Sequence, residues 1–340
     1  MTHILLTATN AVLPIVLIIY LGYFLRQKNF LSPDFLKKGN WLVFHVCLPS
    51  MLFINVYDIE STQSIDWGIV VYCCCATVLL FLLGLVTALL ATPVPQRRGV
   101  ITQCVFRSNF AIIGLSLAAA LGGQEAITIA AVVSAFTIPL FNILGVVSLS
   151  IFLDHHEQQG PKFRSVFINI LKNPLIISVL LGFVCLGLRQ LEILLWDDVV
   201  FTLKDQLAFL YKALSNLKSI ASPLALIVLG GQFTFSAVKG LFREIAVGTL
   251  WRIVLAPLIG IGLAIVLSRC TNWFHCGPEA FPAMIALFGS PVAVSSAIMA
   301  GSMGNDEQLA TQLVVWTSLL SIGTIFLLVC ILMSAGLLII

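Results

Sequence analysis

One stretch of the chain carries polar side chains among residues that would otherwise dissolve in lipid. It reads RSNFAIIGLSL, beginning at Arg107, Ser108 and Asn109 and continuing through Gly114 and Ser116. A buried amide costs free energy unless it finds a partner. Asn109 is therefore either a ligand for a solute or a tie between helices. Arg107 either extends toward the membrane surface or pairs with an acid.

A second stretch, LFGSPVAVSSAIMAG, has the same character and includes Pro291. Proline has no amide hydrogen and disrupts the preceding helical turn, so a helix break is expected there. Broken helices in a membrane protein line a cavity, and the positive end of each helix dipole favours an anion. The predicted substrate-binding residues are Ser108, Asn109, Gly114, Ser116, Ser290, Pro291, Ser295 and Ser296.

The composition predicts an all-α integral membrane protein that lies in the lipid bilayer. Of the 340 residues, 59% are hydrophobic and 10% are charged, against about 25% charged in soluble domains. The net charge of +3 is too small to indicate a nucleic-acid partner. No catalytic, metal or cofactor motif is present, so we expect neither an enzyme nor a cofactor.

A membrane span needs about 20 mostly apolar residues, and ten stretches qualify. The region 191–215 is ambiguous, either a long loop with an interfacial helix or an extension of the seventh span. With the N-terminus outside, the predicted cytoplasmic loops hold eleven Lys and Arg residues and the outside loops five. This bias predicts that both termini lie outside the cell membrane. The predicted spans are 4–25, 40–57, 66–91, 99–121, 126–153, 173–188, 216–234, 245–268, 279–301 and 309–338.

The chain also repeats itself. A Gly-x-x-Glu motif occurs twice, each time between the last two spans of a half, and proline and glycine recur in the first and sixth spans. Five spans per half is an odd number, so the second half enters the membrane from the opposite side, as in many secondary transporters. The predicted units are a first repeat at 1–155, an amphipathic cytoplasmic linker at 156–172 and a second repeat at 173–340. The matched residues are Pro14 and Pro174, Gly22 and Gly182, Gly122 and Gly304, and Glu125 and Glu307.

Together these motifs resemble the auxin efflux carrier family, which includes plant auxin exporters and bacterial malate or malonate carriers. RSNFAIIGLSL is similar to the family's fourth helix, FHVCLPSMLFINVY to its second, and the segment from GSPVAV to LLSIGT to its ninth and tenth. The resemblance implies ten helices in two inverted repeats, with broken helices four and nine crossing. It also implies transport of organic anions. Ser116 stands where the family commonly has proline, so the fourth helix is expected to break less sharply or to gain a hydroxyl.

Alternatives remain open at this stage. A sodium-coupled carrier like the bile-acid transporters would share the architecture, and a channel or a homodimer also fits the composition. His155, His156 and Glu157 lie together, although a polar linker explains them better than a metal site. Cys270 and Cys276 flank a polar loop and could form a disulfide in an oxidising compartment.

Overall fold

The computed structural model confirms an all-helical chain and describes residues 2–58, 67–153, 172–196, 201–271, 274 and 276–338. Residues 156–171 of the predicted linker and the histidine pair His155 and His156 lie outside these residues. Within them one isolated β-bridge occurs. The helices are α1 (Thr2–Gln27), α2 (Pro33–Leu42), η1 (Val43–Cys47), α3 (Leu48–Tyr57), α4 (Trp67–Ala91), α5 (Pro95–Phe106), η2 (Phe110–Gly114), α6 (Leu115–Ile151), α8 (Pro174–Trp196), α9 (Ala208–Gln232), α10 (Ala237–Leu250), η3 (Trp251–Leu255), α11 (Ala256–Cys270), η4 (Pro278–Ala280), α12 (Phe281–Met284), η5 (Ile285–Gly289), α13 (Val294–Ser302) and α14 (Glu307–Ser334).

Seven helical runs of the described chain are long and apolar enough to cross a membrane, and α1 adds a shorter apolar helix over Leu13–Gln27. The predicted fourth and ninth spans are interrupted, because α5 ends at Phe106 and η5 ends at Gly289. The seven runs are Pro33–Tyr57, Trp67–Ala91, Glu125–Ile151, Pro174–Ile193, Ala208–Gln232, Ala237–Cys270 and Glu307–Ser334.

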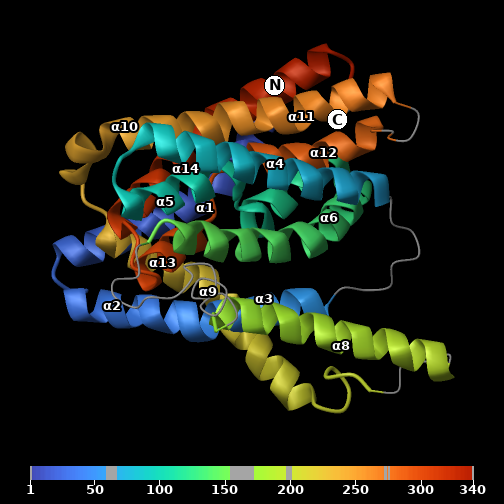
Figure 1. Ribbon diagram of the computed structural model, residues 1–340, viewed down its shortest axis with the longest axis horizontal. Helices are drawn as coiled ribbons and strands as arrows, with labels where there is room; N and C mark the ends of the chain where they lie inside the picture. The colour runs from blue at the N-terminus through green and yellow to red at the C-terminus, as the bar shows by residue number, and fades with distance from the viewer. Residues whose placement is uncertain are drawn as a thin grey trace, which may run out of the picture.

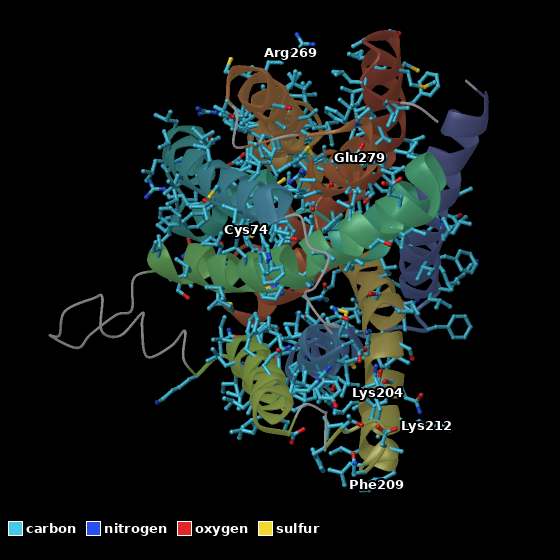
Figure 2. All side chains as sticks on the ribbon, turned by 90° about the vertical axis from the view of Figure 1, so that its right-hand side faces the viewer. Cys74, Lys204, Phe209, Lys212, Arg269 and Glu279 are labelled. Carbon is cyan, nitrogen blue, oxygen red and sulfur yellow. The ribbon has the colours of Figure 1, made fainter. Side chains whose placement is uncertain are left out.

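The helices form two groups (Figure 1). The lower group contains α2, α3, α8 and α9, with α3 packed on both α8 and α9. The upper group contains α4, α5, α6, α10, α11, α12 and α14, and α1 touches α9 of one group and α14 of the other. Figure 2 looks onto one end of the molecule, where the exposed charges of Lys204, Lys212, Arg269 and Glu279 lie at helix ends. Charges at the ends and apolar residues between them suit a bilayer.

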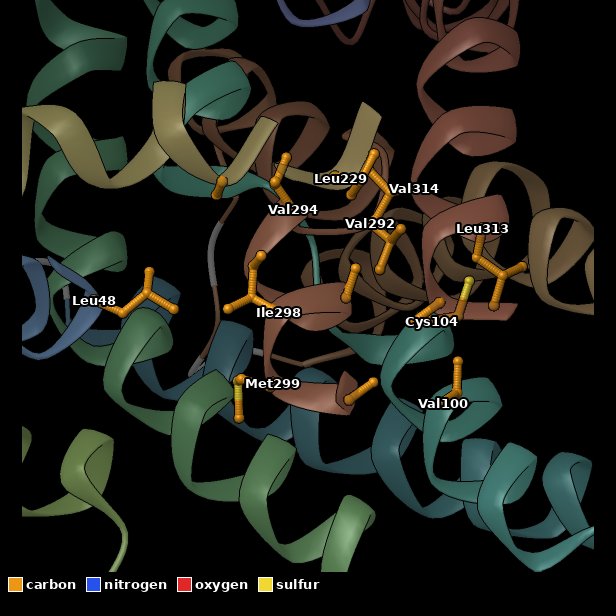
Figure 3. Close-up of a cluster of buried hydrophobic side chains, with 14 of the residues drawn as sticks. Leu48, Val100, Cys104, Leu229, Val292, Val294, Ile298, Met299, Leu313 and Val314 are labelled. Carbon is orange, nitrogen blue, oxygen red and sulfur yellow. The ribbon is translucent and has the colours of Figure 1, made fainter. Parts of the chain in front are cut away.

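The short helix α13 is wedged between the two groups (Figure 3). Its Ile298 and Met299 are fully buried and belong to a hydrophobic cluster that also includes Leu48 of α3, Leu229 of α9 and Leu313 of α14. Such a core is close-packed, so movement of one group past the other must pass through a few discrete arrangements.

Glycines permit the closest approach between α1 and α9. A Cβ at Gly22 would lie 2.3 Å from a carbonyl oxygen of α9, and one at Gly230 would lie 2.0 Å from the carbonyl oxygen of Ile19 in α1. Gly182, which the repeat matches to Gly22, faces α3 in the same manner, with a Cβ expected 2.7 Å from Val56 Cβ. The two matched glycines thus each seat a helix against a helix of the other half.

Of the two predictions for the region 191–215, a long loop with an interfacial helix describes the structure less well. α8 continues to Trp196 and α9 begins at Ala208, so the alternative that the seventh span extends backwards describes this region better. Among the described charged residues of this region, Glu192 and Lys212 lie near the facing ends of the two helices, and Lys204 and Asp205 lie in the turn that precedes α9. Cys270 and Cys276 are both thiols, so the disulfide considered above does not form.

We predict that Gly230→Ala lowers the melting temperature of the purified protein. Alanine favours a helix over glycine by about 0.5–1 kcal/mol, but here its methyl group would collide with the backbone of α1. Overpacking of this kind costs about 1–3 kcal/mol. Gly187→Ala in α8 is the matched control, because nothing lies within 4 Å of its Cβ. Equal melting temperatures for the two variants would contradict the close contact.

Candidate functional site

The two helix breaks pair with each other. After α5, Arg107 adopts an extended backbone conformation, and after η5, Ser290 does the same. Ser108 and Val292 then form an antiparallel bridge. The amide of Asn109 donates to the carbonyl of Pro291 at 2.8 Å, and the amide of Ala293 donates to the carbonyl of Arg107 at 3.2 Å. The residues at each break therefore supply hydrogen-bond partners for backbone groups of the other break, which would otherwise be unpaired in the membrane.

Local sequence explains why the helices stop here. Pro291 cannot donate a helical hydrogen bond. The next amide, that of Val292, donates instead to Thr317 Oγ1 of α14 at 3.2 Å. In the first break, Gly114 lets η2 approach η5, since a Cβ there would lie 3.0 Å from the carbonyl oxygen of Ala286. The bends are thus held by neighbouring helices rather than by loops.

The residues that follow the two breaks line a cavity of about 50 Å³. The helices that begin at Phe110 and Val294 both start at this cavity, so their amino-terminal ends face it. Such ends carry partial positive charge and unpaired amides. α3, α6 and α9 complete the wall. The lining residues are Leu48, Met51, Leu52, Arg107, Ser108, Asn109, Ala111, Ile138, Phe141, Asn142, Ala221, Ser222, Ala225, Ala293, Val294 and Ser295.

Arg107 brings a cation to this cavity. Its side chain is 3% exposed, and Nη2 donates to Asn142 Oδ1 at 2.7 Å and to Ser295 Oγ at 3.0 Å. Nη1 contacts Met299 Sδ. No carboxylate of the described chain lies within 4.0 Å of the guanidinium. The structure agrees with neither of the two sequence-based interpretations, because the Arg107 side chain does not extend to the surface and does not pair with an acid of the described chain.

Two polar atoms beside Arg107 have no partner. Ser108 Oγ and Asn109 Nδ2 are buried without a hydrogen bond, and both residues line the cavity. An unpaired buried donor costs about 1–3 kcal/mol. A solute with hydrogen-bond acceptors would therefore recover part of this cost on entering.

The other predicted site residues have different surroundings. Ser295 lines the cavity, whereas Ser290 Oγ donates to the carbonyl of Ala286 at 2.6 Å within its own helix. Ser296 is buried with an unpartnered hydroxyl but is not among the lining residues. Pro291 and Gly114 shape the backbone as described above, and the side chain of Ser116 lies outside the described part of the chain.

Sequence reasoning missed two polar lining residues, Asn142 and Ser222, and did not assign Arg107 to the site. Asn142 carried a usable signal, since it is a single amide inside the apolar fifth span. Ser222 precedes Pro223 inside α9, so its signal is a hydroxyl beside a proline in an apolar helix. Neither signal identifies which way a side chain faces, which depends on the packing of α6 and α9.

A second buried arginine lies at the carboxyl-terminal ends of α5 and η5, where the two helices break. Arg252 of η3 is 0% exposed and donates from Nη1 to the carbonyl of Val105 at 3.1 Å and from Nη2 to the carbonyl of Phe288. These carbonyls belong to the last turns of α5 and η5, where helix dipoles favour a cation. Arg252 thus stabilises the negative helix ends, while Arg107 lies by the positive ones.

We predict that Arg252→Met destabilises the fold. Methionine fills similar space but leaves the carbonyls of Val105 and Phe288 without their donor, at about 1–3 kcal/mol for each unsatisfied group. Thermal unfolding in detergent should show a lower midpoint, with Arg252→Lys intermediate because it keeps one donor group. A midpoint equal to that of the parent protein would show that the breaks do not depend on Arg252.

Comparison with known proteins identifies the family of the chain. A family model described as membrane transport protein matches residues 7–329. An uncharacterized transporter of Methanothermobacter thermautotrophicus is 23% identical over 328 residues, which cover 94% of this chain and 96% of that protein. An uncharacterized transporter of Methanocaldococcus jannaschii is 22% identical over 264 residues, covering 75% and 78%. The chain therefore belongs to the membrane transport protein family, the family of the auxin efflux carriers that its motifs resemble.

Proposed function

We propose that the protein is a secondary carrier that moves small organic anions across the cell membrane by alternating access. The observation that carries this proposal is the guanidinium of Arg107, buried beside a cavity with no described carboxylate nearby. A buried charge is costly unless it is compensated. A carboxylate of the substrate would supply that compensation each time it binds.

The neighbouring groups favour the same class of substrate. Each helix end contributes about 0.3–1 kcal/mol to anion binding, and up to about 2 when partly buried. A charge-assisted hydrogen bond from Arg107 adds about 1.5–3 kcal/mol. Two helix ends and one such hydrogen bond sum to about 2–7 kcal/mol, and the upper part of this range corresponds to dissociation constants from about millimolar to about ten micromolar. A carrier needs such moderate affinity, because it must release its substrate on the other side.

The position of the cavity supports a moving carrier over a channel. The cavity lies between α3 and α9 of the lower group and the broken helices and α6 of the upper group. Its volume of about 50 Å³ is far below the roughly 300–1,000 Å³ of ordinary ligand pockets. A bound solute larger than a carboxyl group therefore requires the two groups to separate, as alternating access demands.

The sodium-coupled alternative fits the site less well. Among the described residues that line the cavity, Arg107 carries the only charge, and it is positive. A sodium ion there would meet a like charge. Uptake that requires sodium in the medium would favour the sodium-coupled alternative.

We further propose that 1–155 and 173–340 are two inverted five-helix halves joined by the linker 156–172, with both termini outside. The paired breaks and the matched glycines Gly22 and Gly182 support this arrangement. The Glu residues of the two Gly-x-x-Glu motifs also support it, since the spans Glu125–Ile151 and Glu307–Ser334 both begin at one. A glycine with a positive φ angle precedes each of these residues: Gly304 of the second motif, at 74°, and Gly123, the residue after the first motif's Gly122, at 60°.

We predict that Arg107→Gln abolishes carboxylate exchange or weakens substrate affinity at least tenfold. Glutamine keeps the hydrogen bonding but removes the charge, and a loss of about 1.4 kcal/mol corresponds to a factor of ten. Both carboxylate exchange and substrate affinity can be measured by counterflow in proteoliposomes with a panel of mono- and dicarboxylates. Arg98→Gln is the control, because Arg98 lies in α5, the helix that ends just before Arg107, and donates to the carbonyl of Thr92, away from the cavity. Exchange of cations or neutral solutes alone would refute the anion carrier.

We predict that reporter fusions place both termini outside. The basic residues of the loops set this orientation. A phosphatase reporter, active only outside, should be active at the C-terminus, and a fluorescent reporter that matures only inside should be dark there. A cytoplasmic C-terminus would contradict the ten-span inverted arrangement.

A further inference from the structure

The guanidinium of Arg107 lies against one face of α6. Asn142 and Gly145 are three positions apart, so they share a side of that helix. Asn142 Oδ1 accepts a hydrogen bond from Arg107 Nη2 at 2.7 Å, and a Cβ at Gly145 would lie 2.8 Å from Arg107 Nη1. Two neighbouring positions of α6 therefore fix the two terminal nitrogens of the guanidinium. One position supplies an acceptor, and the other has no side chain.

The amide of Asn142 has one orientation that suits its surroundings. Asn142 is 3% exposed, and its Nδ2 donates to the carbonyl of Ile138, one turn earlier in α6, at 2.7 Å. The reverse orientation would place Nδ2 against Arg107 Nη2, donor against donor, and Oδ1 against the carbonyl of Ile138. The side chain of Asn142 therefore presents an oxygen to Arg107, and that oxygen carries no formal charge.

Gly145 is enclosed on the side that faces Arg107. The same Cβ would lie 3.2 Å from Gln103 Nε2 and 3.3 Å from the terminal methyl carbon of Met299, which Figure 3 shows beside α6. The carbonyl of Gly145 already accepts hydrogen bonds from Gln103 Nε2 at 3.0 Å and from Ser148 Oγ at 2.8 Å. A side chain at position 145 would therefore displace the guanidinium from its contact with α6.

Arg97 shows how this chain compensates another arginine charge. It lies near the start of α5 and pairs with Glu244 at 2.8 Å and with Asp306 at 3.0 Å, although it is partly exposed. Arg107 follows the end of the same helix and is more deeply buried, yet its side chain forms no ion pair with a described residue. Aspartate has nearly the same shape as asparagine, so lack of space does not explain the neutral amide at position 142.

We propose that Asn142 determines the anion selectivity of the cavity and that Gly145 positions Arg107 with it. The proposal rests on the anion-carrier function proposed above. Asn142 and Arg107 both line the cavity, and the amide holds the guanidinium there without neutralising it. The charge is then compensated only when an anion enters. A carboxylate at position 142 would compensate it permanently, so a substrate anion would gain no ion pair and would meet a negative charge.

The central test is Asn142→Asp in purified full-length protein, reconstituted in proteoliposomes with a carboxylate that the parent protein exchanges. Its affinity for that carboxylate should fall about tenfold or more, as for Arg107→Gln. Its melting temperature should stay at or above that of the parent protein, because the buried arginine gains a charged hydrogen-bond partner. A merely structural role of Asn142 would not separate affinity from stability in this way.

Asn173→Asp is the matched control, because it makes the same chemical change away from the cavity. Asn173 Oδ1 accepts a hydrogen bond from the amide of Leu175 at the start of α8. Asparagine and aspartate serve about equally well at the start of a helix. The Asn173→Asp variant should therefore exchange carboxylates like the parent protein.

Gly145→Ala gives a second answer that does not depend on the folding of Asn142→Asp. Its methyl group would displace Arg107 Nη1, but Gly145 is not among the lining residues, so the cavity itself stays open. The KM for counterflow should rise several-fold, while the maximal rate should stay within about twofold, as expected for weakened substrate binding.

Three results would overturn the proposal. The first is a folded Asn142→Asp variant with the carboxylate affinity of the parent protein. The second is an Asn142→Asp variant that loses exchange together with a clear drop in melting temperature, which would show a structural role. The third is an unchanged KM in Gly145→Ala. A parent protein that exchanged no carboxylate would instead refute the anion carrier itself, and with it the selectivity that depends on it.

Discussion

The structure depends on one constraint, which is that backbone groups inside a membrane must find partners within the protein. Both helix breaks obey it by pairing with each other, through the amides of Asn109 and Ala293. This pairing brings two distant parts of the sequence to one point and fixes the direction in which four helix ends face. The cavity and the arginines near it are consequences of that crossing.

The crossing separates charge within the apolar interior. Helices that begin at the crossing present positive ends to the cavity, and helices that end there present negative ends to Arg252. Both terminal nitrogens of the Arg252 guanidinium already donate hydrogen bonds to backbone carbonyls. Arg107 keeps a formal charge that only neutral groups contact, Asn142 and Ser295 among them. The two arginines are thus chemically alike but have different surroundings, since Arg252 donates to carbonyls at helix ends and Arg107 borders the cavity.

Polar groups gather at the boundary between the two groups of helices. The cavity beside Arg107 lies on that boundary, and so does the hydrogen bond between Asn40 of α2 and Glu307 of α14. A ligand can shift a conformational equilibrium only by contacting the two states differently. Groups that bridge the boundary meet this condition by their position. A residue buried within one group, such as Arg252, does not.

The sequence by itself determined the apolar spans, the break at Pro291 and the polar stretch from Arg107 to Asn109, because composition and proline chemistry act locally. It also indicated the family, since motifs are local too. Only the tertiary structure decided that Arg107 faces inward, that Ser295 lines the cavity while Ser290 bonds its own helix, and that Glu307 is partly buried against Asn40 while Glu125 is exposed. In each pair the local sequences are alike, and the difference comes from a helix packed against them that lies far away along the chain.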